Sequence, residues 1–339
     1  MNVCPEFTHL LVVPHLRVQN ANAISSPLTH GFPAITAFLG LQWALERKAR
    51  ARGMTLEFNA IGVVCHNHQE QTTEGGFVKA FRLTRNPIAT SVDHKYIKVG
   101  GKYETPAITE EGRIHLDLSL VLAVDVENWD DEQQQADLAT LTELLHGMRV
   151  AGGTVQAAAP DAARRHTPWL ADFTGDDEAR RQAFRKVCMR LLPGTALVAR
   201  DDLIEQRLAE LRQTTPAASR LDAWLSLSRV NWHYDAQANE SKGTWRSDRQ
   251  KGTGWIVPIP VGYGALGELH PAGTVANARD AGTPFRFVES LYSMGEWIGP
   301  HRLRRPQDLL WYADSRPDDG LYRCRNDYAT PTRAVTSIA

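Results

Sequence analysis

The chain has 339 residues, of which 42% are hydrophobic and 23% are charged, as in ordinary globular proteins with a real core. Its formal net charge is −1, which excludes a general electrostatic attraction to nucleic acids or membrane surfaces. A nucleic-acid site would therefore need local clusters of Lys and Arg.

The first half of the chain shows alternating strand and helix patterns. Apolar runs of strand length or with a period of two predict strands, and apolar residues at helical spacing predict helices. These elements are expected at residues 10–18 (strand), 34–50 (helix), 55–65 (strand), 113–122 (strand), 138–148 (helix) and 154–155 (strand). Their order is that of a ferredoxin-like or RNA-recognition-motif (RRM) core. We therefore expect an α+β protein with an RRM-like domain over residues 1–155.

A polar segment joins the first strand to the first helix. Pro14 favours an edge or a bend in the strand, and Pro33 suits the first helical turn. The candidate RNA-binding residues of this segment are Arg17, Gln19, Asn20, Asn22, Ser25 and Ser26. A loop leading into a helix N-terminus lies where free N–H groups attract anions, and amides can read base edges. Alternatively, these amides only tie the loop to the neighbouring strand.

The second and third predicted strands are separated by a long insertion, residues 66–112. Within residues 79–102 it carries six Lys or Arg and one acid, and aromatic residues lie among them or beside them. Pairs of glycines at residues 75–76 and 100–101 are interpreted as hinges. Cations that neutralise phosphates and rings that stack bases predict a thumb-like hairpin that binds single-stranded RNA. Its candidate contacts are Lys79, Arg82, Arg85 and Asn86; a merely solvated hairpin is the alternative.

The segment from Met148 to Gly153 allows two interpretations. It could be a simple helix C-cap. Alternatively, Arg149, Gly152 and Gly153 could contact RNA, because glycine lets a backbone approach phosphates closely.

The second half of the chain is predicted to contain a helical segment and then a β-rich region. Residues 156–250 should hold a linker, helices at 176–192, 201–212 and 221–230, and a mobile polar stretch from 231. Residues 251–339 should form short strands, with elements near 285–292 and 309–312. The basic side of the first helix, from Arg180 to Arg190, is either an exposed face or an RNA contact.

Several classes of protein are disfavoured by missing patterns. Four scattered cysteines without a C-x-x-C pair argue against a disulfide framework and predict a reducing, cytoplasmic setting. No apolar run approaches the ~20 residues of a membrane span, so no membrane partner is expected. Neither GxGxxG nor GxxxxGK[ST] occurs, and no cofactor is expected.

No catalytic signature is present, and a metal is not expected. His66 and His68 stand beside Cys65 but lack further ligands at zinc-site spacing. A ribonuclease would need a general base, and histidine often has this role. The candidates by residue type alone are His30, His66, His94 and His115. This alternative remains open from the residues alone.

Short segments throughout the chain carry a resemblance to a known family. They include Gln-Asn-Ala-Asn-Ala-Ile-Ser-Ser-Pro-Leu-Thr and further blocks at residues 31–33, 83–87, 148–153, 190–194, 254–260, 277–280, 286–289 and 308–312. In these blocks the chain resembles the second Csy subunit, the Cas-five-type tail protein of the type I-F CRISPR surveillance complex.

This resemblance implies a non-catalytic role in binding RNA and in scaffolding. The expected partners are the 5′ handle of the CRISPR RNA, the large subunit and the terminal backbone subunit, with target DNA nearby. The insertion would act as a thumb that separates handle from spacer, and cleavage of precursor RNA belongs to a separate endonuclease in this family. The alternatives are a metal-independent endoribonuclease and a structural partner that never touches RNA.

Overall fold

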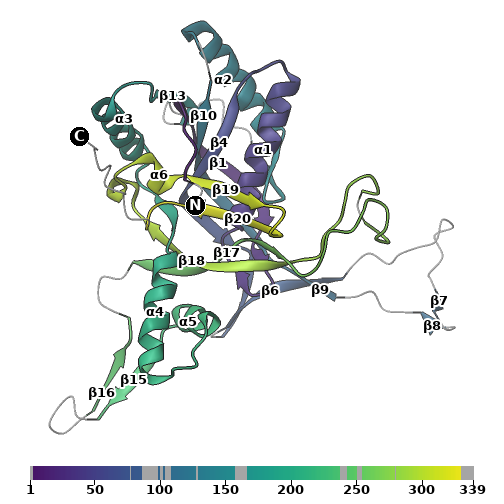
Figure 1. Cartoon of the computed structure of the whole chain (residues 1–339), viewed down its shortest axis with the longest axis vertical. Coiled ribbons are helices and arrows are strands. Elements are labelled where there is room, and N and C mark those ends of the chain that lie inside the picture. Colours follow the sequence, from purple (N-terminus) through teal and green to yellow (C-terminus); the bar gives the residue numbers. More distant parts are fainter. Residues whose placement is uncertain are drawn as a thin grey trace.

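A computed structural model describes residues 3–76, 78–85, 98–99, 102–103, 108–126, 129–156, 166–236, 243–249, 254–278 and 280–329 (Figure 1). It is a mixture of helices and sheet, which confirms the α+β class. The six elements predicted in the first half are β1 (His9–Asn22), α1 (Ile35–Ala51), β4 (Glu57–Glu70), β10 (Arg113–Asp125), α2 (Asp131–His146) and β12 (Gly153–Val155). Their strands are hydrogen-bonded in the order β12-β1-β10-β4, and each neighbouring pair is antiparallel.

The first strand is longer than predicted and corrects the loop interpretation. β1 continues to Asn22, so Arg17, Gln19 and Asn20 lie on a strand. Register shifts after Val13 and after Val18 let β1 bend while it stays paired with β10. The predicted bend near Pro14 is therefore correct, but β1 is central and not an edge strand. Pro33 precedes the N-cap residue Ala34, which places it just before the helix.

The burial of β1 and β10 divides the central strands into two halves. From Leu118 to Val124 every residue of β10 is buried, whereas buried and half-buried residues alternate from Arg113 to Asp117. β1 repeats this division in the opposite direction. Continuous burial requires cover on both faces of a sheet, and alternation indicates one open face. Helices α1 and α2 contribute to the core on one face, and α3 (Asp177–Arg190) covers the other face of the buried half (Figure 1).

Further strands, one beside β12 and others later in the chain, extend the same sheet. They are β11 (Arg149–Val150), β13 (Trp169–Asp172), β14 (Thr195–Ala199), β17 (Trp255–Ala265), β18 (Val288–Ile298), β19 (Trp311–Arg316) and β20 (Leu321–Asn326). The order continues β4-β14-β18-β17-β20-β19, and Trp311 of β19 pairs back with Ile61 of β4. These strands therefore close a ring that begins and ends on β4. The indole of the buried Trp311 donates a hydrogen bond to the Leu197 carbonyl across this ring.

The predicted helices of the second half are present, and capping residues explain where several begin. Further helices are α4 (Asp201–Thr214), α5 (Arg220–Leu227), the 3-10 helix η2 (Pro300–Arg302) and α6 (Pro306–Leu309). Asp130 and Asp176 accept hydrogen bonds from the first turns of α2 and α3, and Ser219 forms a capping box with Asp222 at α5. Each cap satisfies an N–H group that has no partner within its helix.

Two segments predicted as irregular contain strands. β13 lies in the expected linker after residue 155 and pairs with β1 through backbone hydrogen bonds. The polar stretch from residue 231 contains the hairpin of β15 (Trp232–Asp235) and β16 (Thr244–Ser247). The strands were not predicted because most residues of this stretch are polar. The hairpin is held by a pair of aromatic residues, since Tyr234 and Trp245 meet across the two strands with ring centroids 5.4 Å apart.

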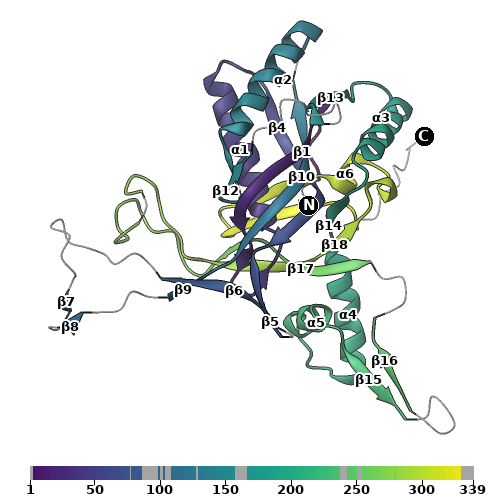
Figure 2. The same ribbon diagram turned by 180° about the vertical axis from the view of Figure 1, so that it is seen from behind.

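The described residues of the insertion between β4 and β10 lie mainly in short strands. They are β5 (Thr72–Gly75), β6 (Val78–Arg85), β7 (Lys98–Val99), β8 (Lys102–Tyr103) and β9 (Ile108–Glu111). β6 pairs with β5 and then with β9, and the β6–β9 ladder extends away from the body of the protein (Figures 1 and 2). We call β5 to β9 the arm. Gly75 and Gly76 belong to the β5–β6 turn, so they are not hinges at the base of the arm.

Candidate nucleic-acid interface

The uncovered half of the central strands forms a polar surface, which we call the open face. Arg17 and Gln19 come from β1, His115 and Asp117 from β10, and Asn67 and Gln69 from β4. Their neighbours Val18 and Leu116 are buried, since successive side chains of a strand point to opposite faces. A cavity of about 380 Å³ lies on this surface, and Gln156 also lines it.

Arg17 is the cation of the open face. Its side chain is exposed and forms no ion pair within the described part of the chain. The facing carboxylate of Asp117 accepts from the His15 ring instead, at 3.1 Å. Arg17 is thus placed to contact an anion without first losing an internal partner.

Asn20 is held in a strained backbone conformation by its neighbours. Its φ of 58° lies in the left-handed region, and its backbone N–H donates to Nδ1 of His115 at 3.2 Å. The Gln71 amide donates to Oδ1 of Asn20 at 2.6 Å. Within the described residues, the Asn20 amide nitrogen has no acceptor. It is therefore a donor that a ligand on this surface could use.

Three of the residues predicted to contact RNA form hydrogen bonds within the protein through their side chains. The Asn22 side chain donates to the Ile24 carbonyl at 2.7 Å and accepts from the Ile24 N–H at 3.1 Å. Ser25 and Ser26 both bond Thr29 within the hairpin of β2 (Ile24–Ser26) and β3 (Thr29–His30). For these three residues, the hydrogen bonds favour a structural role in the local backbone over contact with RNA.

The segment from Met148 to Gly153 is a hairpin turn, which corrects the helix C-cap interpretation. Helix α2 ends at His146, and Ala151 and Gly152 connect β11 to β12 with φ angles of 47° and 79°. A Cβ at Gly153 would lie 2.7 Å from the Ala21 backbone nitrogen, so this glycine is needed for strand packing. At Gly152 a Cβ would meet no atom within 4 Å, and Arg149 is exposed.

A cleft beside this turn carries several aromatic rings. It has a volume of about 620 Å³, and Asn22, Gly152, Trp43, Tyr263 and Tyr322 are among its lining residues. Trp43 and Tyr263 are 44% and 42% exposed, which leaves their rings accessible. The hairpin turn thus lies next to surfaces on which an unpaired base can stack.

The described base of the arm is less basic than the sequence window suggested. Lys79 pairs with Glu74 of β5 at 3.3 Å, and the β6–β9 register sets Arg82 opposite Glu111. Arg85 occupies the last described position of β6, and Asn86 lies outside the described residues. The acids come from segments just outside residues 79–102, which is why counting that window missed them.

Histidines from three separate segments gather at the boundary between the covered and open halves. The His15 ring stacks on His66 with centroids 4.1 Å apart and lies 4.8 Å from His166. Nδ1 of His66 donates to the Pro193 carbonyl at 2.7 Å, and Nε2 lies 2.6 Å from the buried Ser119 hydroxyl. Burial lowers the pKa of His66 below its ordinary value, although the Pro193 carbonyl opposes this shift. Local sequence carries no signal for this cluster.

The basic side of α3 is partly neutralised within the protein. Arg181 pairs with Glu178 at 2.7 Å, and Arg180 donates to the Gly175 carbonyl. The Arg190 guanidinium lies 3.9 Å from the centre of the Trp169 ring. These contacts are those expected of an exposed helix face, and RNA contact there stays a prediction.

Two other features are absent from the described ranges of the chain. Within those ranges no group of three or more His, Cys, Asp or Glu side chains is arranged to hold a metal ion. None of the helices there has the length and apolar character needed to cross a bilayer.

Comparison with known proteins agrees with the resemblance seen in the sequence. The model of the family "CRISPR-associated protein (Cas_Csy2)" matches residues 11–324. The chain is 42% identical over 337 residues to the CRISPR-associated protein Csy2 of Pseudomonas aeruginosa strain UCBPP-PA14, and the match covers 97% of this chain and 98% of that protein. This chain therefore belongs to the Csy2 family of CRISPR-associated proteins.

Proposed function

We propose that this chain is a non-catalytic RNA-binding subunit of a type I-F CRISPR surveillance complex. It holds the 5′ handle of the guide RNA, pairs with the large subunit and abuts the terminal backbone subunit. Family membership supports this assignment. The observation that carries RNA binding is the open face, where exposed Arg17 stands among amides on uncovered strands.

We infer that the core is ferredoxin-like. The support is the antiparallel order β12-β1-β10-β4, with α1 between β1 and β4 and α2 between β10 and β12. In RRM domains the four-stranded sheet is the surface on which bases stack. The open face lies on three strands of this sheet, β1, β10 and β4, and the aromatic cleft is lined partly by α1 and partly by the turn between β11 and β12.

The endoribonuclease alternative has less support from the histidines. Both ring nitrogens of His66 already contact protein atoms, and those of His115 contact Asn20 and Gln71. A general base needs a nitrogen that can accept the proton of a 2′-hydroxyl. His30 is exposed and remains a candidate by type, while His94 lies outside the described residues.

Incubation of the purified chain with labelled CRISPR repeat RNA tests the absence of catalysis. We expect binding without any defined cleavage product. A defined product that His30→Ala or His66→Ala abolishes would replace the proposal with the endoribonuclease. His233→Ala, at an exposed position on β15, serves as the control substitution.

The arm is proposed to place the guide RNA at the junction of handle and spacer. Arg85 and Ile108 are register partners in the β6–β9 ladder, so residues 86–107 can be replaced by Asn-Gly, a two-residue hairpin turn. This deletion should leave the described core folded and reduce crosslinking to the guide. Unchanged crosslinking, with an unchanged melting temperature, would remove the arm from the RNA-binding surface.

The proposed subunit contacts are supported by exposed hydrophobic side chains. Trp232 and Trp245 on the β15–β16 hairpin are 59% and 62% exposed, which is costly for a free surface. We assign this hairpin to a protein partner, because aromatic residues dominate protein interfaces. Trp245→Ser should reduce recovery of partner subunits in affinity purification and leave RNA binding by the isolated chain unchanged.

A further inference from the structure

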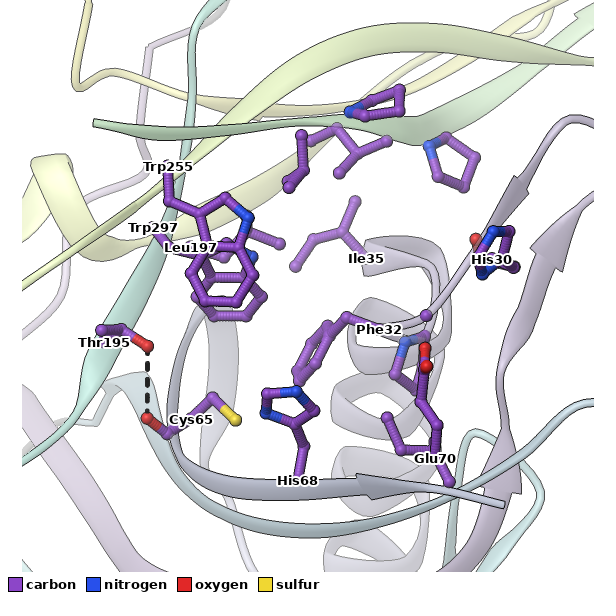
Figure 3. Close-up of a pocket in the computed structure, with 18 of the residues that line it drawn as sticks. His30, Phe32, Ile35, Cys65, His68, Glu70, Thr195, Leu197, Trp255 and Trp297 are labelled. Atoms are coloured by element: carbon purple, nitrogen blue, oxygen red, sulfur yellow. Dashed lines mark hydrogen bonds between the residues drawn. The ribbon is translucent and has the colours of Figure 1, made fainter. Parts of the chain in front are cut away.

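We propose that a pocket between β4 and β17 binds one unstacked nucleobase of the guide RNA; this inference rests on the proposed function. The pocket has a volume of about 450 Å³. It is lined by the end of β4, by residues 30–35 before and at the start of α1, and by β17 and β18 (Figure 3). No motif in the sequence pointed to it, because its walls come from several segments that are far apart in the chain.

Three large aromatic side chains line the pocket. Trp255 of β17 and Trp297 of β18 are register partners, and Figure 3 shows their indoles along one side. Phe32 meets Trp297 edge to face, with ring centroids 4.8 Å apart. Trp255 is 60% exposed, so much of its side chain remains accessible to a ligand. An exposed indole above a cavity is a stacking surface for a base.

The polar groups of the pocket select a neutral ligand with hydrogen-bond donors. The described residues that line it include no Lys or Arg, and Glu70 is an acid, so a phosphate group would be repelled. Within the described residues, the Glu70 carboxylate and the His68 imidazole form no hydrogen bond or ion pair. A carboxylate accepts hydrogen bonds from the exocyclic amino group of a base. The pocket therefore fits a base that carries an amino group.

The pocket adjoins the open face. Asn67 and His68 line both this pocket and the cavity that contains Arg17. A single RNA strand could thus place a phosphate against Arg17 on one side of β4 and turn the adjacent base toward Trp255 on the other. This adjacency favours a base of the bound RNA over a side chain of a partner protein.

The test uses the full chain and repeat-derived RNA with 2-aminopurine substituted at one position at a time. Stacking quenches 2-aminopurine fluorescence, so one position should be quenched by the wild-type protein and recover in Trp255→Ala. The same variant should weaken RNA binding roughly 5- to 150-fold, which corresponds to the ~1–3 kcal/mol of one stacked base. Leu266→Ala, at an exposed hydrophobic residue just beyond the far end of β17, should match the wild type in both measurements.

A second variant tests the pocket without removing the Trp255 side chain. Glu70→Gln should reduce the preference for a base with an amino group over uracil at the quenched position, while the melting temperature stays unchanged. If Trp255→Ala binds as tightly as the wild type and no position recovers fluorescence, the pocket is not a base site. Loss of partner subunits in that variant would then indicate a protein ligand. If neither wild type nor Leu266→Ala binds RNA, the proposed function itself fails and this inference fails with it.

Discussion

The two halves of β1 and β10 belong to the same strands yet serve different purposes. In the half that contains Leu10 and Val121, both faces of the sheet are buried. In the half that contains Arg17 and His115, one face is open and polar. The difference lies in what covers each half, because α3 and its neighbours reach only the first. A strand can thus supply stability at one end and a binding surface at the other.

The largest expected effect is a difference in the free energy of unfolding between substitutions in the two halves. Leu10→Ala removes a fully buried side chain from the core beneath α3 and should cost roughly 2–5 kcal/mol of the free energy of unfolding. Arg17→Ala on the same strand should change it by no more than about 0.5 kcal/mol. Urea denaturation of both variants checks this contrast. Equal losses would mean that the open face is part of the core.

The same Arg17→Ala variant should show its effect in RNA binding. Losing one phosphate contact should weaken binding to all sequences alike and lower the slope of log affinity against log salt by about one. Filter binding at several salt concentrations, with cognate and scrambled RNA, provides the measurement. An unchanged slope would show that Arg17 contacts no phosphate.

Asn20 and Asn22 should behave differently although they are the same residue type on one strand. Asn22→Ala loses two hydrogen bonds to Ile24 and should cost about 0.5–1.5 kcal/mol of stability, without changing the preference for cognate RNA. Asn20→Ala should lower that preference, since its amide nitrogen remains available. Melting temperature and the ratio of cognate to scrambled binding, taken on the same preparations, decide the matter. Loss of preference in Asn22→Ala alone would reverse these roles.

The smallest expected effect concerns His66 at the boundary between the halves. Its pKa is lowered in the folded protein by burial, so below the ordinary value of about 6.5 the unfolded chain binds more protons. Stability should therefore fall as pH falls below about 6.5, by at most about 1.4 kcal/mol per pH unit for this group. Denaturation curves at several pH values should show a shallower fall in His66→Gln. The exposed His233→Gln is the control, and an equal fall in all three proteins would contradict this assignment.

Local sequence patterns were sufficient to identify the long strands β1, β4 and β10 and the helices α1 to α5. The period of two in β10 and the helical spacing in α1 and α3 reflect which side of each element is buried. Residues a few positions apart in the sequence are enough to show this periodicity. Asp130 and Asp176 likewise mark helix starts through bonds made within one turn. The family could also be recognised, because short blocks such as residues 19–29 keep their order along the chain.

The tertiary structure alone decided where the candidate sites lie. Gln19 and Asn20 became strand residues because β10 continues to pair with β1 beyond Val18, and the acid opposite Arg82 came from a strand that folds back. The pocket of Trp255, Phe32 and His68 exists only after β14, β17 and β18 join β4 in one sheet. Pairing between strands and cover by helices depend on residues far apart in the chain, so no local window of the sequence contains them.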